Sequence, residues 1–532
     1  MAPRDAASTG ADFLQLNIDD APTGGRADWL ARQLRLAISD GRLPVGSKLP
    51  ATRSLAADLR VSRGVVTEAY QRLIEDGQIA GRGRGGTVVV AAPLSAPAPT
   101  PVTAAQSPPM TPFTTPFTTP PGPDVFDALR AAPARIDLSP GVPDLAAFPR
   151  AAWLRAERAV LREVPASDLG YGDPRGAPSL RRAVANWLAR NRGIRVDPAE
   201  VLIVAGTAQA LGLISQVLRR DGISAIAVED PGSLGVRQHL HSWGLVTPPV
   251  PVDEDGVRVD ALRATGAAAV MLTPAHQFPT GVVLGGRRRR ELLRWAGAGG
   301  LIIEDDYDAE HRYDRPPVPA LRAMLAEHVC YAGSISKLLA PALRVGWLLA
   351  PPKYRDALVD AKRFADLGNA VLPQLVLAHL MESGELERRL RLLRTRHRRR
   401  RDAMIAAIRT HLPHAVVHGA AAGLHLTVTF GGPTGMPPTG SFDTEVSHTD
   451  VAPTEVSPTE LSENDVSDTG LAAAALVAGV KVQPLSWHCL RAHPPGLVLG
   501  YAASSPTAIT EGVAVLGETL RALHRPPLTA TP

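Results

Sequence analysis

Residues 334–347 read Ser-Ile-Ser-Lys-Leu-Leu-Ala-Pro-Ala-Leu-Arg-Val-Gly-Trp. In this stretch Lys337 is the residue that can form a Schiff base with an aldehyde cofactor. The hydroxyls of Ser334 and Ser336 and the guanidinium of Arg344 are donors of the kind that a cofactor phosphate needs. The stretch therefore predicts a site for a phosphorylated aldehyde, and the surrounding sequence indicates which fold carries it.

Short apolar runs alternate with helix-like segments on the N-terminal side of this stretch. The runs cover residues 201–204, 225–228, 268–272, 301–303 and 329–332. Continuous apolar runs of this length are typical of strands that are buried on both faces of a parallel sheet. Their alternation with helices predicts an α/β domain whose site lies at the carboxyl ends of the strands.

The first ninety residues follow a different pattern. Helical spacing of apolar residues covers 29–40 and 53–59, and Ser62 is a suitable N-cap for a third helix. Residues 81–90 have the pattern of a β-hairpin with a glycine-rich tip. Two helices, a turn, a third helix and a wing form a DNA-reading layout, so residues 1–90 are predicted to be an α+β winged helix-turn-helix domain.

Two low-complexity stretches divide the 532 residues. Between Ala91 and Pro123 the sequence is rich in Ala, Pro and Thr and has no Lys, Arg, Asp or Glu. Such a stretch cannot bury a core, which predicts a linker over residues 91–134. A second stretch, residues 431–470, is expected to be a disordered insertion inside a C-terminal domain that spans residues 135–525.

Composition limits the compartment and the partners. The formal net charge of +5 is small for this length and does not by itself indicate nucleic acid. Cys330 and Cys489 are the only cysteines, which fits a reducing cytoplasm and excludes a disulfide or zinc-finger framework. Residues 1–20 lack the apolar core of a signal peptide, and no membrane segment or metal site is expected. The arginine runs at 287–290 and 388–401 are interpreted as solvated faces of long helices.

The N-terminal motifs identify a family. Residues 46–53, Gly-Ser-Lys-Leu-Pro-Ala-Thr-Arg, and residues 61–70, Val-Ser-Arg-Gly-Val-Val-Thr-Glu-Ala-Tyr, resemble the winged helix of the GntR family, and the match spans residues 26–90. The resemblance implies that double-stranded operator DNA is a partner and that the wing approaches the minor groove. The contacts that it implies are Arg53, Ser62, Arg63, Thr67, Tyr70 and, on the wing, Gly86.

Further motifs precede Lys337 in a fixed order. They are Tyr171-Gly172-Asp173-Pro174-Arg175-Gly176, Gly206-Thr207-Ala208-Gln209, Thr273-Pro274-Ala275-His276-Gln277-Phe278-Pro279-Thr280-Gly281 and Glu304-Asp305-Asp306-Tyr307-Asp308. Their order and spacing resemble the fold-type-I aminotransferases of class I and II, and within them the MocR group of GntR-type regulators. The resemblance covers residues 135–525 and implies pyridoxal 5'-phosphate as the cofactor and a homodimer as the assembly.

The resemblance also assigns roles to single residues. Lys337 would be the catalytic lysine that holds the cofactor, and Asp305 would pair with the pyridine nitrogen, with Asp306 as the nearest competitor. Tyr307 would hydrogen-bond the phenolic oxygen. The phosphate would be held by Thr207, the Ala208 N–H, Ser334, Ser336, Arg344 and, from the second subunit, Tyr171.

Two departures from the family pattern bear on activity. Ser233 stands where the family commonly stacks an aromatic ring on the cofactor, and Val498 stands where aminotransferases commonly place a carboxylate-binding arginine. Arg491 is close in sequence and is the available substitute. We therefore expect that an amine can react at Lys337 but that little or no turnover follows.

These features together predict a cytoplasmic, pyridoxal-phosphate-dependent transcription regulator that senses an amine, an amino acid or the cofactor itself. One alternative is a working aminotransferase with a DNA-binding appendage, and the missing arginine argues against it. Another is a regulator whose C-terminal domain has lost the cofactor, and Lys337, Asp305, Tyr307 and Arg344 argue against that. The sequence does not indicate the effector or the target gene.

Overall fold

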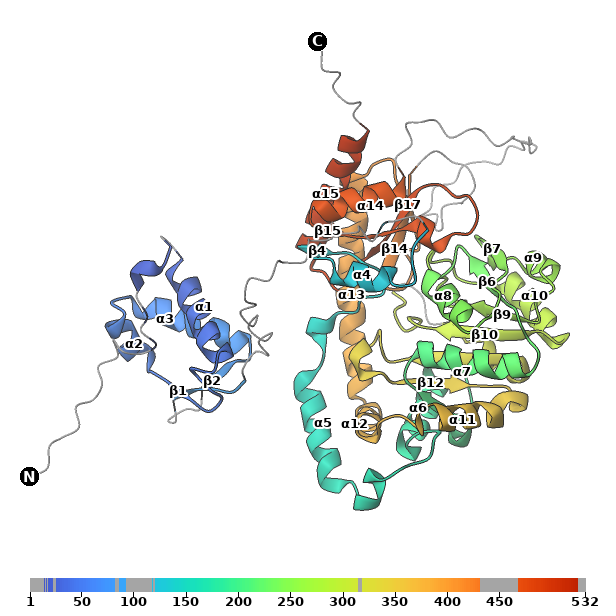
Figure 1. Ribbon diagram of the computed structural model, residues 1–532, viewed down its shortest axis with the longest axis horizontal. Helices are drawn as coiled ribbons and strands as arrows, with labels where there is room; N and C mark the ends of the chain where they lie inside the picture. The colour runs from blue at the N-terminus through green and yellow to red at the C-terminus, as the bar shows by residue number, and fades with distance from the viewer. Residues whose placement is uncertain are drawn as a thin grey trace, which may run out of the picture. The chain divides into compact units, whose positions relative to one another are not determined.

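The computed structural model describes residues 14, 16, 18–22, 25–81, 86–91, 117, 120–313, 318–430 and 467–524 (Figure 1). The chain divides into two compact units, Met1–Phe113 and Thr114–Pro532. Nearly all of the predicted linker's Pro-rich part and of the predicted insertion lies outside the described residues, as does the tip of the wing. No helix in the described ranges is long and apolar enough to cross a membrane.

Three helices and a small antiparallel sheet form the N-terminal unit. The helices are α1 (Arg26–Ser39), α2 (Thr52–Asp58) and α3 (Arg63–Glu75), and the strands lie in the order β1 (Lys48–Leu49), β3 (Thr87–Val89) and β2 (Ile79–Gly81). The inner faces of the helices form one core, in which Leu34, Leu55 and Leu73 are fully buried. The predicted winged helix-turn-helix fold is confirmed.

A large sheet forms the centre of the second unit. Its order is β5 (Leu202–Val204), β12 (Gly346–Leu349), β11 (Val329–Ser334), β10 (Leu301–Asp306), β9 (Ala269–Leu272), β6 (Ile226–Asp230), β7 (Pro249–Asp253) and β8 (Gly256–Val257). The five apolar runs that the sequence predicted as strands of a parallel sheet, β5, β6, β9, β10 and β11, all run in the same direction. Two strands that were not predicted break the pattern, since β12 runs antiparallel to both neighbours and β8 runs antiparallel to β7. The chain between β11 and β12 holds Lys337 and returns without a crossover helix, which is why β12 runs antiparallel.

Helices cover both faces of this sheet, as the prediction of doubly buried strands requires. On one face α7 (Thr207–Arg220), α8 (Leu234–Ser242) and α11 (Pro352–Asp366) pack on alternate strand residues. The other face is covered by α6 (Pro178–Arg192), α9 (Val259–Ala264), α10 (Gly286–Gly297) and α12 (Val371–Glu382). The α/β domain is therefore three-layered, and the polar strand ends are left as the place for a site.

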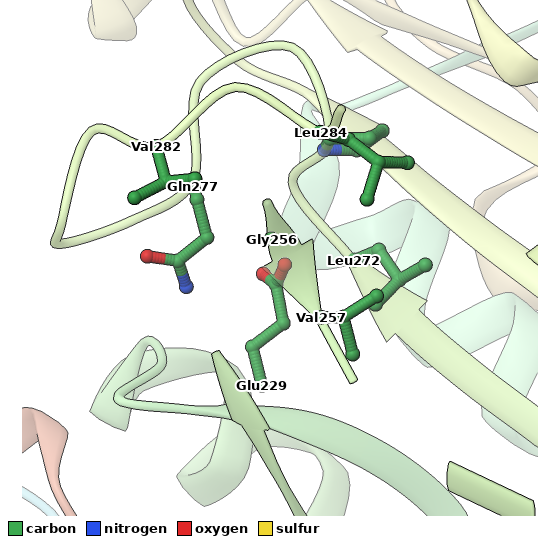
Figure 2. Close-up of a pocket in the computed structure, with 8 residues that line it drawn as sticks. Glu229, Gly256, Val257, Leu272, Gln277, Val282 and Leu284 are labelled. Carbon is green, nitrogen blue, oxygen red and sulfur yellow. The ribbon is translucent and has the colours of Figure 1, made fainter. Parts of the chain in front are cut away.

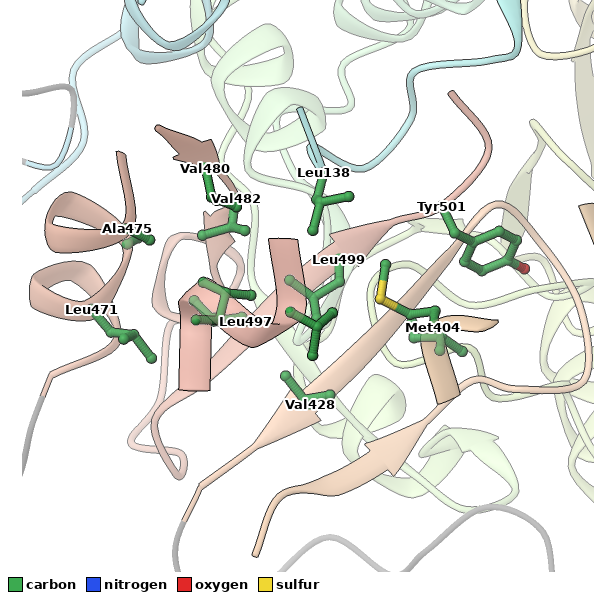
Figure 3. Close-up of a cluster of buried hydrophobic side chains, with 14 of the residues drawn as sticks. Leu138, Met404, Val428, Leu471, Ala475, Val480, Val482, Leu497, Leu499 and Tyr501 are labelled. Carbon is green, nitrogen blue, oxygen red and sulfur yellow. The ribbon is translucent and has the colours of Figure 1, made fainter. Parts of the chain in front are cut away.

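A second sheet and the chain's last helices form a smaller subdomain. The sheet has the order β13 (Val416–His418), β14 (His425–Thr429), β17 (Gly496–Gly500) and β16 (Gln483–Pro484), beside the short pair β4 (Ile136–Asp137) and β15 (Val480–Lys481). Three helices pack on it, α13 (Glu385–His411), α14 (Asp468–Val477) and α15 (Pro506–Leu523). Figure 3 shows the core, in which Leu138, early in the unit, lies close to Leu499 of β17, and to which Tyr501 also belongs. Two further helices, α4 (Val125–Ala131) and α5 (Arg150–Glu163), complete the unit.

The arginine runs are only in part the solvated faces that the sequence suggested. Arg288 and Arg289 of α10 and Arg400 and Arg401 of α13 are buried. Arg288 donates to the carbonyl oxygen of Val257 at 2.7 Å, and the other three also donate to backbone carbonyls. A guanidinium has five donors, so it can satisfy loop carbonyls that helices and strands leave unpaired, and this explains why these side chains turn inward.

Candidate functional site

Lys337 lies in the loop that joins β11 to β12, at the polar end of the large sheet. Its Nζ donates a hydrogen bond to the carbonyl oxygen of Gly141. A Cβ on Gly141 would come within 3.2 Å of that nitrogen, and φ of Gly141 is +78°, so the position favours glycine. Burial lowers the pKa of Lys337, while the charges of Asp308 and Asp305 oppose that shift. A lowered pKa increases the neutral, nucleophilic fraction of the amine.

The predicted phosphate donors come together at the first turn of α7. Gly206 has φ +81°, and a Cβ on it would lie 3.6 Å from Nη1 of Arg344. A Cβ on Gly346 would lie 3.0 Å from Cα of Gly206, which places the start of β12 against the same turn. Ser334 Oγ donates to Ser336 Oγ at 2.8 Å. The free N–H groups at the helix start and the guanidinium face one another, which is the donor set that a phosphate fits. The residues that the structure gathers here are Thr207, Ala208, Ser334, Ser336 and Arg344.

Asp305 and Asp306 compete for one role in the sequence but face opposite sides of β10. Asp306 accepts hydrogen bonds from Arg192 and from the Tyr331 hydroxyl, so it is already paired. Asp305 accepts one long bond, 3.4 Å, from Thr207 Oγ1. Burial, with a smaller effect of the Asp306 charge, raises the pKa of Asp305 to about 7. A buried carboxyl without a strong partner fits the protonated pyridine nitrogen of the predicted cofactor.

Tyr307 stands beside a histidine that the sequence analysis did not single out. The Tyr307 oxygen is 3.0 Å from His276 Nδ1, which is also 2.9 Å from Asp308 Oδ2. The His276 ring lies 5.1 Å from the ring of His425 on β14. Burial, and then the charges of Asp308 and Asp305, raise the pKa of Tyr307 well above its ordinary value, so its hydroxyl stays protonated. The sequence signal for His276 was its place in the motif that ends β9.

The two departures from the family pattern have structural accounts. Ser233 is the N-cap of α8, and its Oγ accepts from the Val236 N–H at 3.3 Å. Val498 is fully buried in β17. Arg491 Nε lies 3.4 Å from Asp230 Oδ2, so the possible substitute for a carboxylate-binding arginine already has an acidic partner.

Tyr171 is not brought to this cluster within one chain. Its side chain is 95% exposed. Other apolar residues that are more than half exposed in the same unit include Leu169, Phe364 and Leu367. Exposed apolar side chains mark a surface that another protein chain covers where they form one contiguous patch.

A small pocket elsewhere in the unit is distinct from the Lys337 cluster (Figure 2). Its lining is mostly apolar, with Glu229 and Gln277 as the polar exceptions. Glu229 accepts from the backbone N–H and from Oγ1 of Thr273, at 3.0 and 2.7 Å. Burial raises the pKa of Glu229 to about 7. Because Glu229 accepts both of these hydrogen bonds from Thr273, we interpret Glu229 as a residue that holds the loop carrying His276 in place.

Four of the predicted DNA contacts lie on the surface of the N-terminal unit. Arg53, Ser62, Arg63 and Thr67 are exposed, at the starts of α2 and α3. Ser62 occupies the N-cap of α3 without a side-chain capping bond, so its hydroxyl is available to another acceptor or donor. Arg63 Nε is 3.4 Å from Thr52 Oγ1.

Tyr70 and Gly86 are placed differently. Tyr70 is 3% exposed, and its hydroxyl donates to the carbonyl oxygen of Pro50 at 2.9 Å. The position therefore does not fit a direct DNA contact, and we assign Tyr70 to holding α3 against the start of α2. Gly86 has φ +82° at the base of the wing, a conformation that favours glycine.

Comparison with known proteins identifies both units. The family described as bacterial regulatory proteins of the gntR family matches residues 27–89, and aminotransferase class I and II matches residues 134–428. The protein is thus a GntR-type winged helix joined to a domain of the class I and II aminotransferase fold. A probable rhizopine catabolism regulatory protein, MocR, of Rhizobium meliloti is 30% identical over 75% of this chain and 81% of its own. The pyridoxine biosynthesis regulator PdxR of Corynebacterium glutamicum is 31% identical over 74% of this chain and 81% of its own. The chain belongs to the MocR-type group of GntR-family transcription regulators.

Solved structures agree with the fold of the second unit. LysN, an alpha-aminoadipate aminotransferase of Thermus thermophilus, is 27% identical with a TM-score of 0.62, over 75% of this chain and 94% of its own. That structure holds N-(5'-phosphopyridoxyl)-L-leucine. A kynurenine aminotransferase of Pyrococcus horikoshii shares the fold, with a TM-score of 0.64 at 23% identity over 76% of this chain and 94% of its own. The homologous fold thus implies a pyridoxal-phosphate site.

Proposed function

We propose that this regulator holds pyridoxal 5'-phosphate on Lys337 and senses there an amine, an amino acid or the cofactor itself. The observation that carries the proposal is the convergence of Lys337, Asp305, Tyr307 and the donor cluster at the first turn of α7. When bound, the cofactor supplies an aldehyde and an electron-accepting ring. Asp305 would hold a proton on the ring nitrogen, and Tyr307 would donate to the phenolic oxygen.

The remaining donors would hold the phosphate. Thr207 and the Ala208 N–H lie at the positive end of α7, where the helix dipole favours an anion. The hydroxyls of Ser334 and Ser336 and the guanidinium of Arg344 approach from the β11–β12 side. The set has hydrogen-bond donors on several sides, as a dianionic group requires.

The proposed assembly is a homodimer. Tyr171, 95% exposed in one chain, would complete the phosphate site of the second subunit. Leu169, Phe364 and Leu367 would be covered in the same contact. Two winged helices in one dimer would engage two half-sites of double-stranded operator DNA in the cytoplasm. The linker between the two units would be shorter than the predicted 91–134, because α4 (Val125–Ala131) packs in the core of the second unit.

A change at Arg63 tests the DNA surface. We expect Arg63→Ala in the full chain to weaken operator binding by about 1–3 kcal/mol, because an arginine at the start of the recognition helix can contact a base edge. The measurement is a titration of labelled operator at several salt concentrations. Arg32→Ala is the matched control, since Arg32 is an exposed arginine of α1 outside the predicted contacts. Equal affinity of Arg63→Ala and wild type would show that the recognition surface is assigned wrongly.

A panel of amines and keto acids tests the sensor against the enzyme alternative. Val498 cannot form the bidentate contact that an arginine makes with a carboxylate, and Ser233 offers no ring to clamp the cofactor. We therefore expect turnover below about 0.01 s⁻¹ with common pairs, against roughly 1–10³ s⁻¹ for typical enzymes. One amine should still change the visible absorbance of the loaded protein and its operator affinity together. Sustained turnover with any pair would favour the aminotransferase alternative.

A further inference from the structure

The Tyr307 hydroxyl shares one nitrogen with a buried carboxylate. His276 Nδ1 lies 3.0 Å from the Tyr307 oxygen and 2.9 Å from Asp308 Oδ2. The side chains of His276 and Asp308 are each 1% exposed. Among the described residues, His276 Nε2 is buried without a hydrogen-bond partner. The roles proposed above use Tyr307 but assign nothing to His276 or Asp308.

The position of one proton decides what Tyr307 can do. If Nδ1 of His276 carries no proton, it accepts from the Tyr307 hydroxyl, whose proton then points toward the histidine. If Nδ1 carries a proton, that N–H is shared between Asp308 Oδ2 and the Tyr307 oxygen. The Tyr307 oxygen then accepts from His276, and its own O–H must donate to another acceptor, because a hydroxyl can accept and donate at the same time. The Asp308 carboxylate is one such acceptor, and the phenolic oxygen of the bound cofactor would be the other.

Two observations select the form with the proton on Nδ1. The Asp308 carboxylate, 2.9 Å away, accepts that N–H and fixes the tautomer. The opposite tautomer would leave an Nε2–H donor buried without an acceptor among the described residues. Buried N–H groups without a partner are rare, whereas an unpaired acceptor is tolerated better.

We propose that His276, fixed by Asp308, is a positioning residue that turns the Tyr307 hydroxyl proton toward the phenolic oxygen of the cofactor. This inference rests on the proposed cofactor site and adds residues to it. Phe278, whose ring meets that of Tyr307 edge to face at 6.3 Å, has no polar atom in its side chain and cannot replace the His276 contact. Asp305 and Glu229 act on Tyr307 through their charges and help to keep its hydroxyl protonated, whereas Asp308 is also a hydrogen-bond partner of that hydroxyl.

A metal ion is the competing interpretation of the same residues. Ligand atoms of His276, Asp308 and His425 lie within 4.8 Å of one another. His425 Nε2 lies 3.2 Å from the carbonyl oxygen of Pro279, so Nδ1 is the one ring nitrogen that His425 could offer to an ion. A Cβ on Gly423 would come within 2.4 Å of His276 Nδ1 and 2.8 Å of an Asp308 oxygen, so backbone already packs against the edge that an ion would need. The contacts therefore favour a shared proton over an ion.

A double-mutant cycle tests the proposal in the loaded full chain. The variants are His276→Leu, Tyr307→Phe, the double variant, and His276→Asn, whose amide N–H lies close to the position of Nδ1–H. Covalent loading is measured first by borohydride reduction and mass. Absorbance is then followed from low to high pH to obtain the pKa of the visible band. A hydrogen-bond donor to the phenolic oxygen stabilises the deprotonated form of the bound cofactor, in which that oxygen carries more negative charge. Loss of the donor should therefore raise the pKa of the band.

We expect His276→Leu to raise the pKa of the band by about half a unit to one unit, the size of one hydrogen bond. The shift should vanish within about 0.2 units in the Tyr307→Phe background, and His276→Asn should restore most of the wild-type value. Asp308→Asn, which permits the other tautomer, should shift the pKa in the same direction and serves if His276→Leu does not fold.

Several results would overturn the proposal. An equal shift with and without the Tyr307 hydroxyl would show a general electrostatic effect, and no shift in either His276→Leu or Asp308→Asn would remove the role. A stoichiometric metal in the purified protein would replace the Nδ1 proton and also overturn it. If wild type takes up no cofactor, the cofactor site itself is wrong and the inference falls with it. If the protein takes up the cofactor but the effects of His276→Leu and Tyr307→Phe are independent of each other, the role of His276 is wrong and the proposed cofactor site stands.

Discussion

In Lys337→Ala we expect complete loss of the covalent cofactor, because no other described lysine combines a lowered pKa with a neighbouring phosphate site. After incubation with pyridoxal 5'-phosphate and borohydride, wild type should carry the added mass on the peptide that contains Lys337. The variant should carry none. Its operator binding should persist, since the winged helix has its own core.

Lys353→Ala is the matched control for this experiment. Lys353 is an exposed lysine of α11 that pairs with Asp221, so its loss should leave the adduct unchanged. An adduct on Lys48, Lys353, Lys362 or Lys481 in wild type would show that the site is assigned to the wrong lysine. Absence of any adduct would contradict the sensor model as a whole.

The largest effect on stability should come from Arg192→Met. Arg192 and Asp306 pair with side chains that are each 1% exposed. Burial opposes the charge on Arg192, but Asp306 and Tyr331 hold its pKa above the ordinary value. Removing one partner of a buried pair leaves an uncompensated charge, which costs about 3–5 kcal/mol. Urea unfolding of the C-terminal unit, followed by tryptophan fluorescence, should show this loss.

The acidic groups around Arg192 give this prediction a pH dependence. Burial, and then the Asp306 charge, raise the pKa of Glu304 to about 7, and loss of Arg192 should raise it further. A group whose folded pKa is raised stabilises the fold below its unfolded pKa and loses that contribution as pH rises through the folded value. The deficit of Arg192→Met should therefore shrink as pH falls from 8 toward 5.

Arg190→Met provides the comparison for Arg192→Met. Arg190 lies two residues before Arg192 on the exposed face of α6, with a side chain that is 55% exposed and paired to Glu387. An exposed pair contributes roughly 0–1 kcal/mol, so this variant should be nearly as stable as wild type. Equal losses in the two variants would show that the buried pair has no special role.

Local sequence patterns predicted most elements but not all strand directions. The apolar run at 268–272 became β9, and that at 329–332 became the first part of β11. The strand β12 and its antiparallel course were not predicted, because direction depends on the path of the intervening loop and not on an apolar run. The prediction of the exposed face of α3 was accurate, because that face follows from the helical spacing of its apolar residues. Tyr70 was misassigned because its hydroxyl has a partner, Pro50, that is twenty residues away in sequence.

The candidate site shows the same division between local and long-range information. The motif around Asp305 and Asp306 predicted that one of them faces the cofactor, and strand alternation in the structure separates them. His276 and Asp308 were not assigned a role, because their contact joins two loops that are 32 residues apart. The DNA contacts, the cofactor ligands and the domain limits remain predictions until the experiments above are done.

The hydrogen bond from Lys337 Nζ to the Gly141 carbonyl oxygen competes with covalent attachment of a cofactor to the same nitrogen. Gly141 lies shortly after β4, in the first strand-forming segment that follows the linker from the DNA-binding unit. When Nζ becomes covalently engaged it loses protons, so the Gly141 carbonyl must find another donor. The segment then depends more on its backbone bonds, such as the Leu138 N–H to the Lys481 carbonyl oxygen at 2.8 Å. Chemistry at a single amine is in this way thermodynamically linked to the segment that follows β4, the first strand of the second unit.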